Sequence, residues 1–311
     1  MSKPKVIVIG GPTASGKTSL SIELAKKING EIISSDSMQI YKDMTIGTAK
    51  PTVEEMDGIP HHLLDFVSPD ERYSVADFKR DAESAIEEIL SKKKNPIVVG
   101  GTGLYIDSLV YGIEYPDIEL DDEYRKKLMQ EADTEEGLIN LYNKAKKIDP
   151  EAIRKISPND KKRITRILEV YNATGKTKTE LEKISRINGV KYDYKVFAIN
   201  MDREKLYDRI NLRVDIMLEQ GLIDEVENLV KKYSNFPTAM QGLGYKEVVE
   251  FLNKEISKEE MIDKIKQESR RYAKRQLTWF RKNKEIIWLD GLADRQKNID
   301  LIINKAELQN N

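Results

Sequence analysis

The sequence of 311 residues contains no cysteine, only two histidines and no apolar run of about 18 residues. The absence of cysteine excludes disulfides, cysteine nucleophiles and cysteine-ligated zinc. His61 and His62 are adjacent and cannot share a strand face, so a histidine metal site is not expected. The short apolar runs predict no membrane span. The formal net charge is only −1, so any nucleic-acid partner would have to bind a local basic patch.

The first third of the chain alternates apolar strands with helices. Residues 5–9 are expected to form a buried strand, with a glycine loop and a helix over residues 17–27 after it. A second short strand ends near Asp36, and residues 73–94 form an amphipathic helix. Residues 95–110 repeat the order of strand, glycine turn and helix. This alternation predicts an α/β fold with a parallel sheet.

The character of the chain changes between residues 115 and 192, where three charged helices and no buried strand are expected. A buried strand returns at residues 194–200, a helix follows Asp202 and ends at Gly221, and a last strand is expected at residues 286–290. We therefore expect a core of residues 1–114 and 193–290 with a helical C-terminal region. Residues 115–192 form an inserted helical subdomain and residues 291–311 a polar tail.

The segment GPTASGKT has the form of a phosphate-binding loop between a strand and a helix. Its residues are Gly11, Pro12, Thr13, Ala14, Ser15, Gly16, Lys17 and Thr18. Glycines let backbone N–H groups surround an anion, and the helix N-terminus adds a positive dipole. Lys17 is expected to contact the terminal phosphates and Thr18 to ligate Mg²⁺. The motif predicts a P-loop NTPase-like core but leaves open whether the ligand is ATP or another diphosphate ester.

Polar residues follow the other strands. Asp36 follows the second strand, where it is a candidate general base, a Mg²⁺ ligand or a turn residue. Thr102 lies in a second glycine turn, VVGGTGLY, which is either a ligand site or a plain tight turn. Arg209 and Arg213 lie one helical turn apart, where they can clamp phosphates or pair with acids such as Asp208.

Two segments concentrate positive charge. Residues 159–170 contain four basic residues, and residues 264–284 contain nine Lys and Arg against one acid. Tyr272, Trp279 and Phe280 are interleaved with the second group. Such a segment is either a solvated helix face or a surface for an RNA backbone, with the aromatic residues as stacking or core residues.

Seven segments together resemble the bacterial tRNA dimethylallyltransferases, also called tRNA isopentenyltransferases, in order from about residue 4 to residue 290. They are GPTASGKT, SSDSMQIYKDMTIGTAKP, PHHLLDF, VVGGTGLYIDSL, PNDKKRITRILEVY, RINLRVDIMLEQGLIDEV and AMQGLGYKE. The resemblance implies transfer of a dimethylallyl group from dimethylallyl diphosphate to N6 of the adenosine 3′-adjacent to the anticodon (tRNA position 37). The substrates implied are tRNAs that read codons starting with U.

The resemblance also implies roles for residues. Asp36 would act as the base, Lys17 and Thr18 with Mg²⁺ would neutralise the departing diphosphate, and Arg213, with Arg209 as the alternative, would assist them. Residues implied to contact tRNA are Asp36, Ser37, Met38, Gln39, Thr102, Arg125, Asn159, Asp160, Lys161, Lys162, Arg163, Arg166, Gln241, Gly242, Gly244, Tyr245 and Lys246. The basic helix at residues 264–284 would lie along the anticodon stem.

Other functions remain open at this stage. They are a P-loop kinase of a nucleotide or small molecule, an adenylate isopentenyltransferase that makes free cytokinin, and an RNA-binding module without catalysis. A kinase needs neither the Asp-Ser-x-Gln run nor the basic helices, and an enzyme acting on free AMP needs no helical insert. The chain has no cysteine for the zinc finger of some eukaryotic members and no evident transit peptide. We therefore expect the bacterial type, a cytoplasmic location and a monomer.

Overall fold

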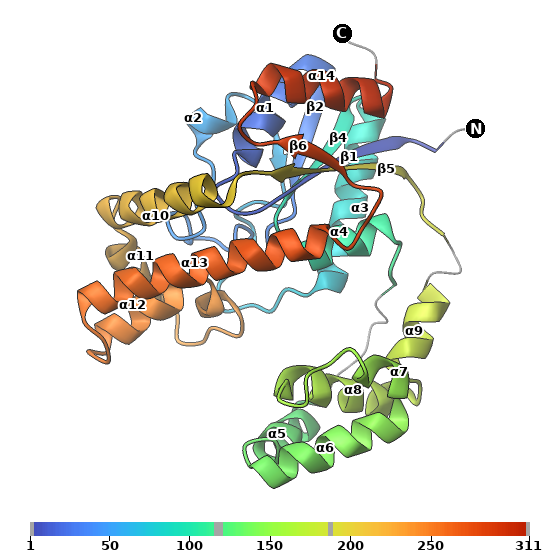
Figure 1. Ribbon diagram of the computed structural model, residues 1–311, viewed down its shortest axis with the longest axis vertical. Helices are drawn as coiled ribbons and strands as arrows, with labels where there is room; N and C mark the ends of the chain where they lie inside the picture. The colour runs from blue at the N-terminus through green and yellow to red at the C-terminus, as the bar shows by residue number, and fades with distance from the viewer. Residues whose placement is uncertain (1–2, 115–120, 186–188, 309–311) are drawn as a thin grey trace. The chain divides into compact units, whose positions relative to one another are not determined.

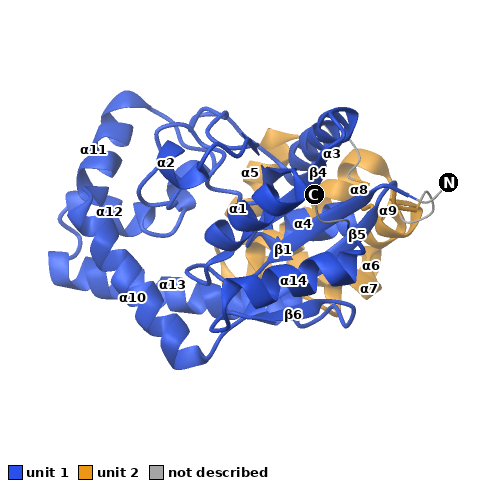
Figure 2. Ribbon diagram, turned by 90° about the horizontal axis from the view of Figure 1, so that it is seen from above, with its two compact units in different colours: residues 1–110, 191–311 blue, residues 111–190 orange. Residues whose placement is uncertain are grey.

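The computed structural model describes residues 3–114, 121–185 and 189–308. The chain forms two compact units, which are unit 1, residues 1–110 and 191–311, and unit 2, residues 111–190 (Figure 2). The sequence placed the insert at residues 115–192, whereas the structure has both boundaries slightly earlier in the chain. Among the described residues, none of the helices is both long and apolar enough to cross a membrane.

Unit 1 is built on one six-stranded sheet of order β3-β2-β4-β1-β5-β6, and all its paired strands are parallel (Figure 1). The strands are β1 Lys5–Gly10, β2 Gly30–Ser34, β3 His61–His62, β4 Asn95–Gly100, β5 Asp193–Asn200 and β6 Ile287–Asp290. This confirms the predicted α/β fold with a parallel sheet. Gly10 pairs with Gly100 on one side and with Ala198 on the other, so the central strands end at one level. Ligands of open parallel sheets bind at this edge.

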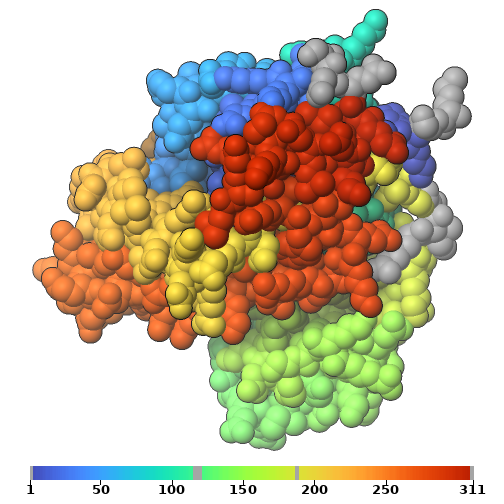
Figure 3. Space-filling view, turned by 45° about the horizontal axis from the view of Figure 1, so that its top comes forward, coloured from blue at the N-terminus to red at the C-terminus, as the bar shows by residue number. Residues whose placement is uncertain are grey.

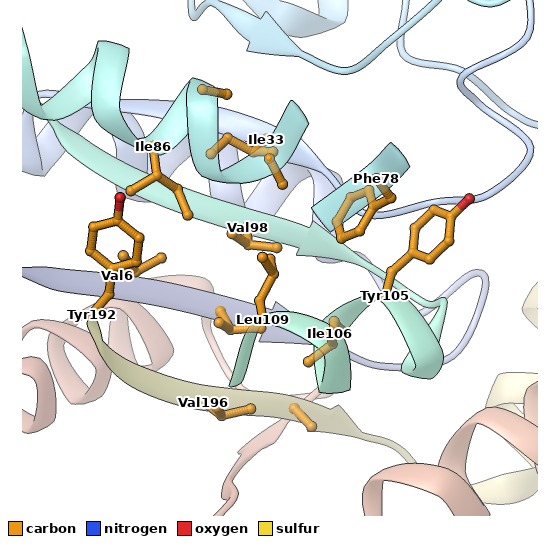
Figure 4. Close-up of a cluster of buried hydrophobic side chains, with 14 of the residues drawn as sticks. Val6, Ile33, Phe78, Ile86, Val98, Tyr105, Ile106, Leu109, Tyr192 and Val196 are labelled. Carbon is orange, nitrogen blue, oxygen red and sulfur yellow. The ribbon is translucent and has the colours of Figure 1, made fainter. Parts of the chain in front are cut away.

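Helices cover both faces of the sheet because side chains alternate along each strand. Ile7 and Ile9 of β1 pack against α1 (Lys17–Ile28) and α14 (Arg295–Ala306). Val6 and Val8 face the opposite layer, made by α3 (Val75–Ser91) and α4 (Gly103–Val110). Figure 4 shows this second layer, in which the rings of Phe78 and Tyr105 stack with centroids 4.0 Å apart.

The predicted polar tail at residues 291–311 is wrong. Residues Arg295–Ala306 form α14, whose N-terminus is capped by the side chain of Asp294. Ile299, Ile302 and Ile303 are buried in the same core as the central strands. Their spacing gives one apolar helix face among polar residues, and that face covers the sheet. The C-terminal residues, in red, form a broad part of the face visible in Figure 3.

A third group of helices lies beside the edge of the sheet at which the central strands end. It consists of α10 Arg203–Glu219, α11 Leu222–Lys232, the 3₁₀ helix η1 Ala239–Gln241, α12 Tyr245–Leu252 and α13 Lys258–Phe280. Ile40, Tyr41 and Met44 pack into the core of these helices, so the segment after β2 is firmly held although it contains only the short helix α2 (Val53–Met56). The 23-residue α13 contributes Met261 to this core. It contributes Phe280 to the core between the sheet and helices α3 and α4.

Unit 2 is helical and has its own small core. Its helices are α5 Asp122–Glu131, α6 Glu135–Ile148, α7 Pro150–Ile153, α8 Lys161–Thr174 and α9 Lys178–Ser185. Leu128, Leu141 and Ile164 are buried between α5, α6 and α8, the three helices that the sequence predicted. Two helices of unit 2 were not predicted from the sequence because both are short: α7 is a single turn of four residues, and α9 has eight residues of which one is buried.

Candidate active site

A cavity of about 350 Å³ lies in unit 1 where β1, β2 and β4 end. Lys17 and Thr18 of the P-loop line it, together with Asp36 from the turn after β2 and Arg213 from α10. The structure therefore brings the four predicted catalytic residues to one cavity. Arg209 is exposed and does not line it, so of the two arginines Arg213 is the one placed to reach a ligand.

The P-loop has the backbone geometry of an anion site. Gly11 has φ of +144° and Gly16 has φ of +90°, conformations that residues with a Cβ rarely adopt. A Cβ on Gly11 would also lie 3.2 Å from the backbone nitrogen of Ile199 in the neighbouring strand. The Ser15 hydroxyl is buried without a hydrogen-bond partner within the part of the chain that the structure describes. A bound phosphate oxygen would give this hydroxyl an acceptor.

Positive charge converges on the cavity. Burial lowers the pKa of Lys17 from 10.5 to about 7, since the effect of Asp36, which raises it, is outweighed and Arg213 lowers it further. Burial likewise lowers the pKa of Arg213. The Lys17 ammonium donates to the carbonyl oxygen of Pro12 at 2.6 Å. Two partly buried basic groups beside one carboxylate favour a ligand with several negative charges, as a diphosphate has.

Asp36 is held in a tight turn, which we call the acid turn (residues 36–39). Its Oδ1 accepts hydrogen bonds from the backbone N–H groups of Met38 at 2.9 Å and Gln39 at 3.4 Å. The backbone N–H of Ser37 donates to Oγ1 of Thr102 at 3.1 Å. The predicted Thr102 therefore links two strand ends. It supports the acid turn and does not itself line the cavity.

Gln39 lines the cavity, yet its amide is used within the protein. Its Nε2 donates to the carbonyl oxygens of Thr48 at 3.2 Å and Ala49 at 3.1 Å. The side chain thus joins the acid turn to residues 45–49, which we call the wall loop because Gly47 and Thr48 also line the cavity. Its contact with tRNA stays a prediction.

One face of α13 also lines the cavity, and it was not predicted from the sequence. Ile265, Ser269, Tyr272 and Gln276 all line the cavity at spacings of four, three and four residues, and Arg275 joins them. Gln276 accepts from the P-loop N–H of Thr13 at 2.9 Å and donates to the carbonyl of Gly101 at 3.0 Å. Burial and Asp36 raise the pKa of Tyr272 to about 12, so its hydroxyl stays neutral near neutral pH. The helical spacing was visible in the sequence, but the basic residues drew the interpretation toward a solvated RNA-binding face.

The residues between 241 and 246 that were implied to contact tRNA lie in different environments. Gln241, Gly242 and Gly244 line the cavity. Tyr245 also reaches it but is fully buried, and its hydroxyl donates to Oε1 of Glu225 at 2.6 Å. Lys246 is exposed and does not line the cavity.

The remaining implied tRNA contacts belong to unit 2. Arg125 of α5 and Arg166 of α8 both pair with the buried carboxylate of Glu169, at 3.3 Å and 3.4 Å. Both arginines stay about half exposed, so a second anion can reach them. Asp160 caps α8 by accepting from the N–H of Arg163 at 3.1 Å, and Lys161 pairs with Asp133 at 3.1 Å. Asn159, Lys162 and Arg163 lie at the same end of α8.

The fold and the cavity define a P-loop-containing α/β transferase-type site in which an anion-binding loop faces a carboxylate. The family model described as IPP transferase matches residues 39–283, and the chain belongs to this family. A tRNA dimethylallyltransferase of Acetivibrio thermocellus is 56% identical over 286 residues, which is 92% of this chain and 91% of that protein.

Solved structures agree. The tRNA isopentenylpyrophosphate transferase of Bacillus halodurans has a TM-score of 0.73 and 44% identity, with 98% of this chain and 97% of that chain covered. A eukaryotic dimethylallyltransferase, described as acting on tRNA, has a TM-score of 0.77 and 33% identity, with 97% of this chain and 80% of that chain covered. The resemblance identified from the seven sequence segments is thereby confirmed.

Proposed function

We propose that this protein transfers a dimethylallyl group from dimethylallyl diphosphate to N6 of the adenosine 3′-adjacent to the anticodon of tRNA. One observation carries the proposal. The cavity places a P-loop with Lys17 and Arg213 on the same site as the carboxylate of Asp36. A site for the diphosphate of an alkyl donor therefore lies beside a group that can accept a proton from an attacking amine.

At C1 of the dimethylallyl group, the reaction forms one bond and breaks one. The N6 nitrogen of adenine attacks C1 of the dimethylallyl group, and the bond between C1 and the diphosphate oxygen breaks with its electron pair on the diphosphate. Asp36 takes the proton that N6 loses. Lys17 and Arg213 stabilise the negative charge that grows on the leaving diphosphate. The apolar cavity residues Val214, Met217 and Ile265 suit the five-carbon chain.

The residues present fit a Mg²⁺ ion. Among the described residues no cluster of three or more His, Cys, Asp or Glu side chains forms a metal site, so the protein offers no complete cage. Thr18 of the P-loop brings a hydroxyl to the cavity, and in P-loop proteins this hydroxyl helps to hold a Mg²⁺ ion whose other ligands include substrate phosphates. Bound there with the donor, the ion would supply further neutralisation of the diphosphate charge.

Unit 2 is proposed to hold the anticodon stem-loop through the Arg125 and Arg166 pair and the N-terminal end of α8. A base must leave its stack before it can enter a cavity of this kind. We propose a monomer as the working enzyme.

The test is a comparison of acceptors. Dimethylallyl diphosphate with a labelled prenyl group is incubated with tRNA, with AMP and with no acceptor, in the presence and absence of ATP. We expect label in tRNA alone and no change in ATP. Label in AMP but not in tRNA would make the protein a free-cytokinin enzyme, and ATP turnover without prenyl transfer would make it a kinase.

A further inference from the structure

The carboxylate of Glu225 on α11 is surrounded by backbone donors of the wall loop. Its Oε2 accepts from the N–H groups of Thr45 at 2.9 Å and Ile46 at 2.7 Å, and its Oε1 accepts from the N–H of Gly47 at 3.1 Å. Three successive N–H groups pointing at one anion form a concave nest of the kind that usually holds a phosphate or other anion. Here a side chain 178 to 180 residues away in sequence fills it.

Tyr245 completes this arrangement. Its hydroxyl gives Oε1 of Glu225 a fourth hydrogen bond, at 2.6 Å. Its ring lies so close to the wall loop that a Cβ on Gly47 would be 2.5 Å from a ring carbon. Because Gly47 and Tyr245 both line the cavity, the position of the wall loop defines one side of the site.

The wall loop is connected in turn to the acid turn. The carbonyls of Thr48 and Ala49 accept both hydrogens of the Gln39 amide. The backbone N–H of Gln39 donates to Asp36, the proposed base. Hydrogen bonds and the short stretches of covalent chain between them therefore connect Glu225, through the wall loop and Gln39, to the carboxylate of Asp36.

We propose that Glu225 is a positioning residue that sets the orientation of Asp36 toward the acceptor base by anchoring the wall loop. The inference rests on the proposed function and deepens it, because it concerns the acceptor side of the same site. Glu225 does not touch the cavity itself. It acts through the loop, and the donor side, held by the P-loop and Arg213, lies outside this set of hydrogen bonds.

The helix that carries Glu225 does not depend on it for its place. Leu222, Val226 and Leu229 of α11 are buried in the core shared with α12 and α13. Replacing Glu225 by glutamine therefore leaves α11 packed and changes what the wall loop and the Tyr245 hydroxyl meet. The amide keeps one acceptor oxygen but presents an NH₂ group to donors that need an acceptor.

The experiment compares Glu225→Gln with Glu227→Gln on the same helix, where Glu227 is half exposed and pairs with Lys231 at 2.8 Å. Prenyl transfer to an anticodon stem-loop gives kcat and the KM for dimethylallyl diphosphate. Misplacing a reacting group by about 1 Å can cost roughly 100-fold in rate, so we expect kcat to fall roughly 10- to 100-fold in Glu225→Gln. The donor KM should change less than about 2-fold, and Glu227→Gln should match the wild type.

Hydrogen exchange adds a readout that does not depend on activity. The backbone amides of residues 45–47 should exchange faster in Glu225→Gln than in the wild type. Their exchange rates should be unchanged in Glu227→Gln. Gln39→Ala should lower kcat as well, and the double variant should lose less than the product of the two single losses, because both act on the same contact path.

The outcomes separate this inference from the proposed function. A wild-type protein without prenyl transfer refutes the proposed function, and the exchange result then shows only whether Glu225 anchors the loop. An active wild type with unchanged kcat in Glu225→Gln refutes the positioning role. Equal loss in kcat and in the fraction of folded protein would reduce Glu225 to a stabilising residue and also overturn the proposal.

Discussion

Replacing Gln276 by alanine should destabilise unit 1 and disturb the P-loop together. Gln276 is 5% exposed and bridges the N–H of Thr13 and the carbonyl of Gly101, two groups on neighbouring strand ends. Alanine leaves both backbone groups without this partner. A buried polar group that loses its hydrogen bond costs about 1–3 kcal/mol.

The magnitude follows from where these groups lie. Two groups would cost about 2–6 kcal/mol if both stayed dry. Gln276 also lines the cavity, so water can reach the space that alanine vacates. We therefore expect a loss of about 2–3 kcal/mol in the free energy of unfolding, which shifts a urea midpoint by about 1 M at a slope of about 2–3 kcal/mol/M.

Tryptophan fluorescence measures this loss in unit 1 alone. The chain has two tryptophans, Trp279 in α13 and Trp288 in β6, and both belong to unit 1. The matched control is Gln267→Ala, an exposed position on the same helix, which should change stability by less than about 0.5 kcal/mol. If the two variants unfold at the same urea concentration, the bridge made by Gln276 does not stabilise the fold and the reasoning is refuted.

Three further predictions concern function. Free Lys17 has a pKa of about 7 and a diphosphate favours its charged form, so at pH 8 donor binding should take up a proton and weaken as pH rises. Calorimetry in buffers of different ionisation enthalpy measures the number of protons taken up on donor binding. Binding without proton uptake would contradict the prediction. Asp36→Ala should lose several orders of magnitude in turnover while still binding tRNA in a filter assay, and near-normal turnover would exclude it as the base. Arg166→Ala should weaken tRNA binding and lower the slope of log K against log salt by roughly one, whereas an unchanged slope would mean no phosphate contact.

The parts of the site that could be predicted are local in sequence. The P-loop is a contiguous motif between a buried strand and a helix, and Asp36 follows a strand end, so one segment at a time was enough to find them. The parallel sheet followed from the alternation of strands and helices.

The site residues that were not predicted owe their roles to contacts between segments that are far apart in the sequence. Gln276 lies in a helix whose basic residues resemble a solvated face, and only its packing beneath the P-loop shows its role. Glu225 contacts the wall loop from 180 residues away, which no local pattern reveals. The C-terminal helix was missed for a different reason, because the apolar spacing of Ile299, Ile302 and Ile303 was present but read as a polar tail.

The central claim is that the P-loop holds a leaving diphosphate and does not spend ATP. The most direct measurement counts products when the protein turns over dimethylallyl diphosphate and an anticodon stem-loop in the presence of ATP. We predict one diphosphate released for each N6-alkylated adenosine and no ADP formed. ADP that accumulates in step with turnover, or alkylation without equal release of diphosphate, would contradict the account.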